Sequence, residues 1–305
     1  MRITPLAVPI AYEPHRLEWP DRVTLVAPLG VRFWDPVSER VVSDGLIAYA
    51  AAAANPRRRV QAVTSPSGVH VFRNLPGLRE FENGTGDAPF WARHPPRLEF
   101  IVTVEDLTRQ FQPFSFTVRL PVRDLLPWEC DPSGSPPKPI AAVPLFSTPN
   151  RAVPGGFAVI RAELWDEVTG SPAAWAMVEA QLPAASPVRG LADRDGRVAL
   201  IFPYPEPPGE AIASPPGSPP HAAGLSMFRQ TWDVALSAYY APRQPAPAAP
   251  DLCDALLQPV ATLWADETRA QPLGTQILQF GRDLIVRSAG AANGRLLVSP
   301  IGSPP

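Results

Sequence analysis

The sequence predicts an all-β protein with two tandem Greek-key β-sandwich domains, a proline-rich linker between them and a further C-terminal segment. Composition provides the first two observations: 42 of the 305 residues are prolines, and 45% of the residues are hydrophobic. Proline lacks a backbone donor and is confined to turns, edges and linkers, so long helices are excluded. Because the apolar content still allows a buried core, we expect short strands with stiff connections.

An internal repeat is the third observation, and it predicts the duplication. The segment at 34–38, WDPVS, recurs at 165–169 as WDEVT, an offset of 131 positions. The turn glycines that follow, Gly68 and Gly196, are 128 positions apart, which fits a small indel in an intervening loop. Strand-like runs surround both copies. We therefore expect one sandwich over 22–125 and a second over 151–242.

The first sandwich is preceded by a proline-containing arm at 1–21. Its strands are expected at 23–26, 31–34, 60–63, 68–72, 99–104 and 114–120. Alternation places Val31 and Phe33 on the buried face, and Arg32 and Trp34 on the opposite face. The last two strands are expected to form a hairpin.

The segment 126–150 is rich in proline and is expected to be an extended, semi-rigid linker. Strands of the second sandwich are expected at 157–165, 174–180, 198–202 and 231–239, and a polar hairpin turn at 190–197 feeds the third of these. Between the last two, residues 205–224 contain so much proline, glycine and serine that they are expected to form a surface loop.

The C-terminal segment, 243–305, repeats neither sandwich. Residues 251–257 predict a short helix that is capped by Asp251 and stopped by Pro259. Strands are expected at 276–280, 284–287 and 295–298, and Asn293-Gly294 is a typical hairpin turn between the last two. Because an isolated ribbon is marginal in water, we expect this segment to dock on a sandwich or on another chain.

Charge and cysteine content limit the function classes. The net charge of −2 and the pI of about 6.1 provide no electrostatic case for nucleic acid or for an anionic membrane. All but one of the 27 basic residues are arginines, which fits a GC-rich bacterial genome. Neither a signal peptide nor a membrane span is expected. Cys130 and Cys253 show no metal or redox spacing, so we expect no disulfide and a cytoplasmic protein, or one incorporated into a released particle.

Candidate catalytic and metal-binding groups are isolated from one another. Asp193-x-Asp195-Gly196 lacks the further carboxylates of a calcium loop, and a turn accounts for the same residues. The four histidines do not form a metal pair, no serine lies in a nucleophile elbow and no phosphate loop is found; the histidines are His15, His70, His94 and His221. We therefore expect a non-enzymatic protein without catalytic residues, metal or cofactor.

Aromatic and apolar side chains outside the expected core are the candidate contact residues. Trp34 and Trp165 occupy the same place in the two copies, opposite the buried face. Phe280 and Ile285 of the C-terminal ribbon are further candidates for an interface with other subunits or a second copy. The alternative is a carbohydrate- or ligand-binding module that uses Trp34, Trp91 and Trp165.

The segment 190–198, GLADRDGRV, follows a strand that ends in DEVTG at 166–170. This combination resembles the carboxypeptidase regulatory-like domain, a transthyretin-type Greek-key β-sandwich. The resemblance covers residues 22–122 and 151–242, although the turn of the first copy is degraded to SPSG at 65–68. No peptidase domain accompanies the sandwiches, so the resemblance implies a fold and not a hydrolase activity.

A second resemblance concerns the tandem arrangement together with PGGFAVIRAELWD at 154–166. It is similar to uncharacterised proteins found with bacterial phage-tail-like contractile injection particles. This resemblance implies a structural accessory protein at a baseplate, cap or surface, which acts through protein–protein contacts.

Overall fold

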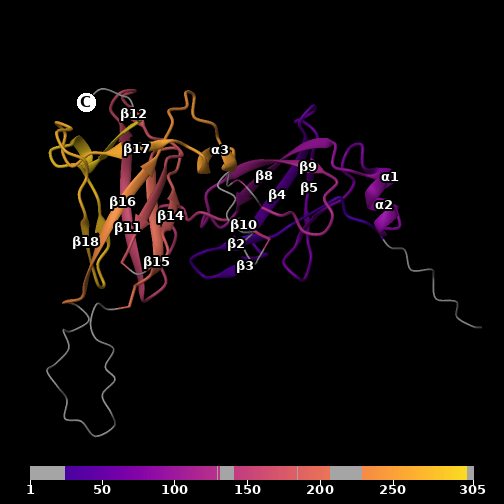
Figure 1. Ribbon diagram of the computed structural model, residues 1–305, viewed down its shortest axis with the longest axis horizontal. Helices are drawn as coiled ribbons and strands as arrows, with labels where there is room; N and C mark the ends of the chain where they lie inside the picture. Colours follow the sequence, from indigo (N-terminus) through magenta and orange to yellow (C-terminus); the bar gives the residue numbers. More distant parts are fainter. Residues whose placement is uncertain (1–24, 129, 131–140, 184, 207–228, 301–305) are drawn as a thin grey trace, which may run out of the picture.

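The computed structural model describes residues 25–128, 130, 141–183, 185–206 and 229–300, and it is nearly all-β, as the sequence predicts (Figure 1). Two lobes lie side by side along the longest axis, and we call them the N-terminal unit and the C-terminal unit. The predicted arm at 1–21, His15, His221 and most of the predicted loop at 205–224 lie outside the described residues.

The N-terminal unit contains three small sheets, with strand orders β1–β7–β6, β10–β2–β3 and β5–β4–β8–β9. Its elements are β1 Leu29–Val31, β2 Phe33–Asp35, β3 Arg40–Val42, β4 Leu46–Ala52, β5 Arg59–Gln61, β6 Val63–Thr64, β7 His70–Phe72, α1 Arg79–Glu82, α2 Ala88–Arg93, β8 Leu98–Asp106, β9 Phe114–Leu120 and β10 Val143–Pro144. The strand expected at 23–26 is not formed over its described residues, 25–26.

The C-terminal unit is built around β11, which pairs with β12, β15, β19 and β20, and around β16, which pairs with β13, β17 and β18. Its elements are β11 Phe157–Asp166, β12 Ser171–Pro172, β13 Met177–Gln181, β14 Val188–Leu191, β15 Arg197–Pro203, β16 Thr231–Tyr239, α3 Leu252–Leu256, β17 Val260–Leu263, β18 Gln276–Gln279, β19 Leu284–Ile285, the 3-10 turn η2 Ala292–Gly294 and β20 Leu296–Pro300.

The hairpin predicted from 99–104 and 114–120 is confirmed as β8 and β9, with Val102 opposite Phe116. Alternate residues of β9 are buried, as expected for a strand with one face on a core. β4 was not predicted, because its sequence LIAYAAA is rich in alanine, which is depleted in strands. Its alanines Ala48 and Ala50 are fully buried, so tertiary packing outweighs their weak strand propensity.

The strand register repeats with the offsets predicted from the sequence. In the N-terminal unit Leu29 lies opposite Phe72, and in the C-terminal unit Ile160 lies opposite Leu200. Leu29 and Ile160 are 131 positions apart, as the WD segments are. Phe72 and Leu200 are 128 positions apart, as the turn glycines are. The two copies thus share backbone pairing as well as sequence.

Two further pairs of strands correspond, with offsets of 131 positions between Leu46 and Met177 and 133 between Asp106 and Tyr239. Leu46 of β4 lies opposite Asp106 of β8, and Met177 of β13 lies opposite Tyr239 of β16. The nine-residue strands β8 and β16 are therefore equivalent. The loops that follow them, 107–112 and 240–245, occupy equivalent places at the ends of their units.

In each unit a later segment of the chain adds a strand parallel to the WD strand. In the N-terminal unit this added strand corrects the expectation of a linker at 126–150. Val143 of β10 lies beside Phe33 of β2, and Leu296 of β20 lies beside Leu164 of β11. β10 lies in the segment expected to be a linker at 126–150, and Leu145 just after it is fully buried. Over its described end, from 141 onwards, this segment is therefore packed structure and not a free spacer.

The prediction of a two-stranded C-terminal ribbon is wrong, because β19 and β20 do not pair with each other. β19 pairs with β11, and β20 pairs with β11 and β17. Asn293 and Gly294 do adopt the positive φ values that favour this dipeptide in turns. The turn nevertheless connects β19 and β20, which pair with different parts of β11. Residues expected to dock as a separate segment instead complete the C-terminal unit. In it β11 pairs with β19 and β20, and β16 pairs with β17 and β18.

The short helix predicted at 251–257 is confirmed as α3. The side chain of Asp251 accepts a hydrogen bond from the backbone N–H of Asp254 at 3.1 Å, which caps the first turn. α3 lies where the two units meet (Figure 1). The helices α1 and α2 were not predicted; they lie at the opposite end of the N-terminal unit, where Phe81 and Phe90 pack together.

Candidate functional site

The polar turn predicted at 190–197 is confirmed, although its flanking strands do not form a hairpin. The Asp193 carboxylate accepts hydrogen bonds from the backbone N–H groups of Asp195 and Arg197, at 2.9 and 2.8 Å. β14 pairs with β13 and β15 pairs with β11, so the turn connects two sheets. Burial raises the pKa of Asp193 despite these hydrogen bonds. The carboxylate thus has a structural role in closing the turn.

The two histidines that the structure describes have structural surroundings. His70 is buried against the ring of Phe33, and the Nδ1 atom of His94 lies 2.8 Å from the Phe90 carbonyl oxygen. Within the described ranges, no group of three or more His, Cys, Asp or Glu side chains is arranged to hold a metal ion. No helix of this part of the chain has the length and hydropathy to cross a bilayer.

The repeated WD segments place two buried carboxylates at equivalent turns. Asp35 and Asp166 are 2% and 0% exposed. Each accepts a hydrogen bond from the backbone N–H two residues later, that of Val37 at 3.0 Å and that of Val168 at 2.9 Å. This side-chain-to-backbone bond is the Asx turn that Asp favours. The two turns therefore project Val37 and Val168 from their units in the same way.

The two carboxylates differ in their further partners. Arg151 donates two hydrogen bonds to Asp35, at 2.8 and 2.6 Å, and the whole pair is buried. Burial raises the pKa of Asp35, but the hydrogen bonds from Arg151 and Ser38 and the arginine charge outweigh it, so the pKa is lowered. Asp166 instead accepts from the Tyr240 hydroxyl at 3.2 Å. Burial and the neighbouring Asp166 raise the pKa of Tyr240.

Val37 forms the first contact between the units. It is 6% exposed and packs against Val159, Ala199 and Ile201, which lie on the outer face of β11 and β15. Arg151 lies in the connection between the units, so its ion pair with Asp35 fixes the chain beside this contact. The connection is also held by Arg161, which donates to the Pro149 carbonyl oxygen.

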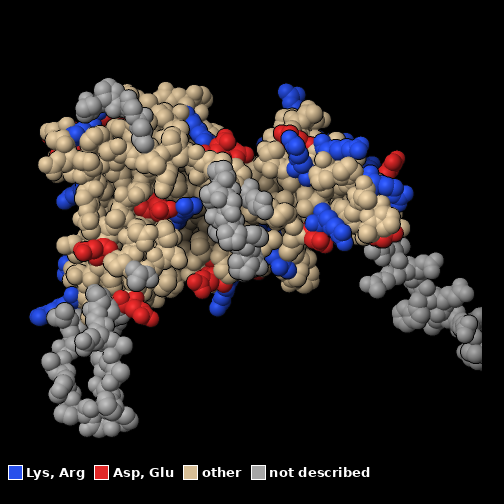
Figure 2. Space-filling model, viewed as in Figure 1, with Lys and Arg blue, Asp and Glu red and all other residues tan. Residues whose placement is uncertain are grey.

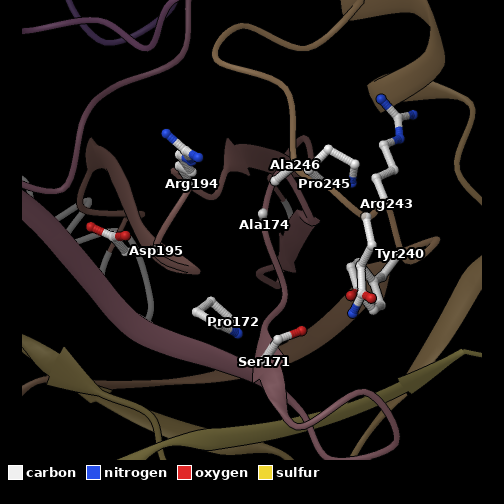
Figure 3. Close-up of a pocket in the computed structure, with 10 residues that line it drawn as sticks. Ser171, Pro172, Ala174, Arg194, Asp195, Tyr240, Arg243, Pro245 and Ala246 are labelled. Carbon is white, nitrogen blue, oxygen red and sulfur yellow. The ribbon is translucent and has the colours of Figure 1, made fainter.

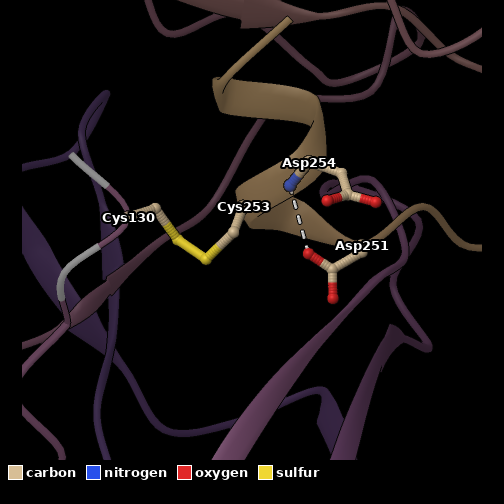
Figure 4. The surroundings of a disulfide bond; sticks show 4 residues. All are labelled: Cys130, Asp251, Cys253 and Asp254. Atoms are coloured by element: carbon tan, nitrogen blue, oxygen red, sulfur yellow. Dashed lines mark hydrogen bonds between the residues drawn. A yellow bond between two sulfur atoms is a disulfide. The ribbon is translucent and has the colours of Figure 1, made fainter. Parts of the chain in front are cut away.

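A disulfide forms the second contact, and it corrects the expectation that the cysteines are unpaired. Cys130 and Cys253 are bonded, with their Cα atoms 5.1 Å apart (Figure 4). Cys253 lies on α3, whose Leu252 and Ala255 belong to a hydrophobic core made mostly of N-terminal residues. That core also includes Ala174, Trp175, Met177 and Leu191 of the C-terminal unit. The bond therefore links α3, part of the C-terminal unit, to the end of the N-terminal unit.

Trp175 lies beside this second contact, and its ring is among the largest buried side chains. Its Nε1 atom donates to the Pro247 carbonyl oxygen at 3.0 Å, and its carbonyl oxygen accepts from Gln258 at 2.8 Å. Ser115 on β9 donates its backbone N–H to Pro250 at 2.8 Å. The segment that leads into α3 is thus hydrogen-bonded to both units.

A shallow hollow of about 590 Å³ lies at the end of the C-terminal unit that carries β12 (Figure 3). Arg194 and Asp195 lie on one side of it and Tyr240 and Arg243 on the other. It is lined by Ser171, Pro172, Ala174, Arg194, Asp195, Tyr240, Arg243, Gln244, Pro245 and Ala246. Among the described residues, neither arginine forms an ion pair.

The four residues predicted to form an interface do not lie on one unit. They are Trp34, Trp165, Phe280 and Ile285. Trp34 is half-buried on β2. Trp165 is half-buried on β11, and the Arg295 guanidinium lies 3.3 Å from its ring centroid. The ring of Phe280 packs at a tilt against Tyr204, with ring centroids 4.6 Å apart. Ile285 is 67% exposed, so among these four residues it is the one most available to a partner.

The aromatic residues of the alternative, ligand-binding hypothesis lie on separate elements. Trp34 is on β2, Trp91 on α2 and Trp165 on β11, and these three rings make no contact with one another. Trp91 packs against Phe81, with centroids 5.2 Å apart. Basic and acidic side chains are interspersed on the face shown in Figure 2.

Two features of this arrangement were not singled out from the sequence. Arg151 is an arginine at the end of a proline-rich segment, and its partner Asp35 is 116 positions away. The cysteines are 123 positions apart, so neither pairing leaves a local signal. The repeat itself was the available signal for Val37 and Val168, since both belong to the WD segments.

Comparison with known proteins identifies no family for this chain. No protein-family model and no curated protein matches it. Among solved structures, a streptococcal ancillary pilin matches with a TM-score of 0.21 and 9% sequence identity, over 89% of this chain. The chain spans 62% of the length of that pilin. A likeness of this size does not show a shared fold.

Proposed function

We propose that this protein is a non-enzymatic structural protein that acts through protein–protein contacts, as an accessory component of a phage-tail-like contractile injection particle. The observation that carries the proposal is the joining of the two units. A buried ion pair, a hydrophobic contact and a disulfide connect them. Such joining suits a part that must keep its shape within an assembly.

Exposed apolar side chains support a role in contacts with other proteins. Ile277 on β18 and Ile285 on β19 are 64% and 67% exposed, on two short strands that follow each other in the chain. An exposed apolar side chain is stabilised when a partner covers it. These two side chains favour other protein subunits as partners.

The family of the two domains and the kind of particle are inferred from the two sequence resemblances. The repeated register of β1 with β7 and of β11 with β15 supports a duplicated sandwich of the carboxypeptidase regulatory-like, transthyretin type. The particle assignment depends on the likeness of residues 154–166 and of the tandem arrangement to injection-particle proteins.

The disulfide supports a different compartment from the cytoplasm expected from the sequence. Disulfides persist in oxidising environments and are rare where thiols are kept reduced. The Cys130–Cys253 bond therefore favours a protein that functions outside the reducing cytoplasm, as a component of a released particle would.

The test is co-sedimentation of the tagged, full-length chain with particles from the cells that encode it. Mass spectrometry of the heavy fraction should find the chain at a fixed ratio to tube and sheath subunits. In matched cells that lack the tube subunit, the chain should move to the light fraction. A chain that stays in the light fraction of both strains, without a stable protein partner, would contradict the proposal.

A further inference from the structure

The internal repeat shows that one of two equivalent turns is covered and the other is not. Val37 and Val168 each lie two residues after the buried aspartate of the repeat, and each donates its backbone N–H to that carboxylate. Val37 is 6% exposed because it packs against the C-terminal unit. Val168 is 57% exposed. The C-terminal unit thus presents, uncovered, the same feature with which the N-terminal unit contacts its neighbour.

The loops beside the two turns differ in their hydrogen bonds. In the N-terminal unit the end of the loop 107–112 is bonded to 145–151: the backbone N–H of Gln112 donates to the Phe146 carbonyl oxygen, and that of Thr148 donates to the Gln110 carbonyl oxygen, both at 2.8 Å. In the C-terminal unit the equivalent loop, 240–245, lines the hollow in Figure 3. Within the described part of the chain, this end therefore has a free turn beside a free depression.

The covered turn indicates what kind of surface fits the free one. Val37 packs on small and branched apolar side chains of two paired antiparallel strands, where Val159 lies opposite Ile201. Ala199, the third contact, is on the same face because residues two apart in a strand point to one side. A projecting valine of this kind therefore fits the outer face of an antiparallel sheet.

The charged side chains around the hollow indicate which charge the partner's surface should carry. Arg194 and Arg243 lie on opposite sides of it, without an ion pair among the described residues. Asp195 is the acidic side chain that lines it with them. A partner whose sheet face is rimmed by aspartate or glutamate would complement these two arginines.

The two sheet faces of this chain that correspond to the one under Val37 do not fit the free turn. The face of β11 and β15 is already covered by Val37. On the equivalent face of the N-terminal unit, the register places Arg73 where the C-terminal unit has Ile201, and Arg73 is exposed. That arginine would approach Arg194 and Arg243 and would be repelled by them. Both observations favour a different protein as the partner.

We propose that the Val168 turn and the adjoining hollow form a docking site for the outer sheet face of a β-sandwich domain on another subunit. Val168 would then contact the bound domain in the way that Val37 of the N-terminal unit contacts the C-terminal unit. This inference rests on the proposed function, because it names the surface through which the chain enters its assembly.

The test places the photo-cross-linker p-benzoylphenylalanine at position 168 of the full-length chain, in the cells that encode it. After irradiation, mass spectrometry of the cross-linked peptides should identify one second protein, with the adduct on a strand of a β-sandwich. The same label at Leu107, which is 69% exposed on the N-terminal unit, is the matched control and should not cross-link that protein. An adduct with this chain itself, or with a helix or loop of a partner, would overturn the inference.

A substitution gives the second readout. Val168→Asp should reduce the amount of chain in the particle fraction by about tenfold or more, because an interface would bury an unpaired carboxylate. Val168→Ile should retain it, and the thermal midpoint of either variant should be unchanged because the side chain is exposed. If the chain sediments with particles and Val168→Asp does so equally, the docking site is wrong and the proposed function stands. If the unsubstituted chain never sediments, the proposed function itself fails.

Discussion

The guanidinium of Arg151 donates two hydrogen bonds to the carboxylate of Asp35, at 2.8 and 2.6 Å, and both side chains are almost fully buried. Arg151 lies in the connection between the units, and Asp35 lies at the turn that carries Val37. The pair therefore holds the connection against the turn through which the units touch. In the C-terminal unit the Tyr240 hydroxyl takes the equivalent place beside Asp166.

Replacing Arg151 by methionine should destabilise the protein strongly. The change leaves the Asp35 carboxylate buried without its cation, which costs about 3–5 kcal/mol. Urea unfolding measures this loss. The matched control is Arg189→Met, which removes a pair with Glu179 in which the arginine side chain is 54% exposed, and should cost less than about 1 kcal/mol. Equal losses in the two variants would contradict the role given to Arg151.

Replacing His70 by valine should remove a pH dependence of stability. Burial lowers the pKa of His70 below 6.5, and neither ring nitrogen has a hydrogen-bond partner among the described residues. The unfolded chain therefore binds the additional proton between the two pKa values. The free energy of unfolding should fall as the pH drops from 6.5 towards the folded-state pKa, and level off below it.

Valine is the matched replacement because Val198 occupies the equivalent place in the C-terminal unit, opposite Ala162 as His70 is opposite Val31. Unfolding by urea at a series of pH values should show the loss in the original chain and a flatter profile in His70→Val. The same slope in both proteins would show that His70 is not its source.

Removing the disulfide should destabilise the protein without changing its fold. Replacing Cys130 and Cys253 by serine opens a long loop between the units, and the free energy of unfolding should fall by about 2–4 kcal/mol. A reducing agent should cause a similar loss in the original chain and none in the serine variant. Free-thiol labelling that detects two reactive cysteines in the unreduced, folded protein would contradict the bond.

Replacing Gly196 by alanine should be more harmful than the same change at Gly170. Both glycines have a positive φ, of 78° and 63°. A Cβ atom at Gly196 would lie 2.3 Å from the Leu164 carbonyl oxygen, whereas none lies within 4 Å at Gly170. We expect a loss of about 1 kcal/mol at Gly170 from backbone strain alone, and more than about 2 kcal/mol at Gly196. Thermal unfolding of both variants measures the difference, and equal losses would rule out the clash.

The parts of the fold that were predicted correctly depend on local or repeated signals. The offsets of 131 between the WD segments and 128 between the turn glycines predicted a duplication, and they recur in the registers of Leu29 with Phe72 and of Ile160 with Leu200. The helix at α3 was predicted because Asp251 is a capping residue next to the chain that it caps. Such features are encoded within a few residues, or twice in the same sequence.

The parts that were missed depend on distant partners. β10 was expected to be part of a linker and is a strand because β2 lies beside it. β20 was expected as a strand, but its partners are β11 and β17 and not the preceding strand. The Cys130–Cys253 bond and the Asp35–Arg151 pair span more than a hundred positions. Of the predicted interface residues, Trp165 is covered by Arg295, while Val168 became a candidate only when the structure showed Val37 buried.

The claim that the two units are locked into one body is tested most directly by calorimetry of the oxidised, full-length protein. The contacts through Val37, Arg151 and α3 predict a single unfolding transition, in which the calorimetric and van't Hoff enthalpies agree. Two resolved transitions, each with the enthalpy of one unit, would show that the units unfold independently and would contradict the account.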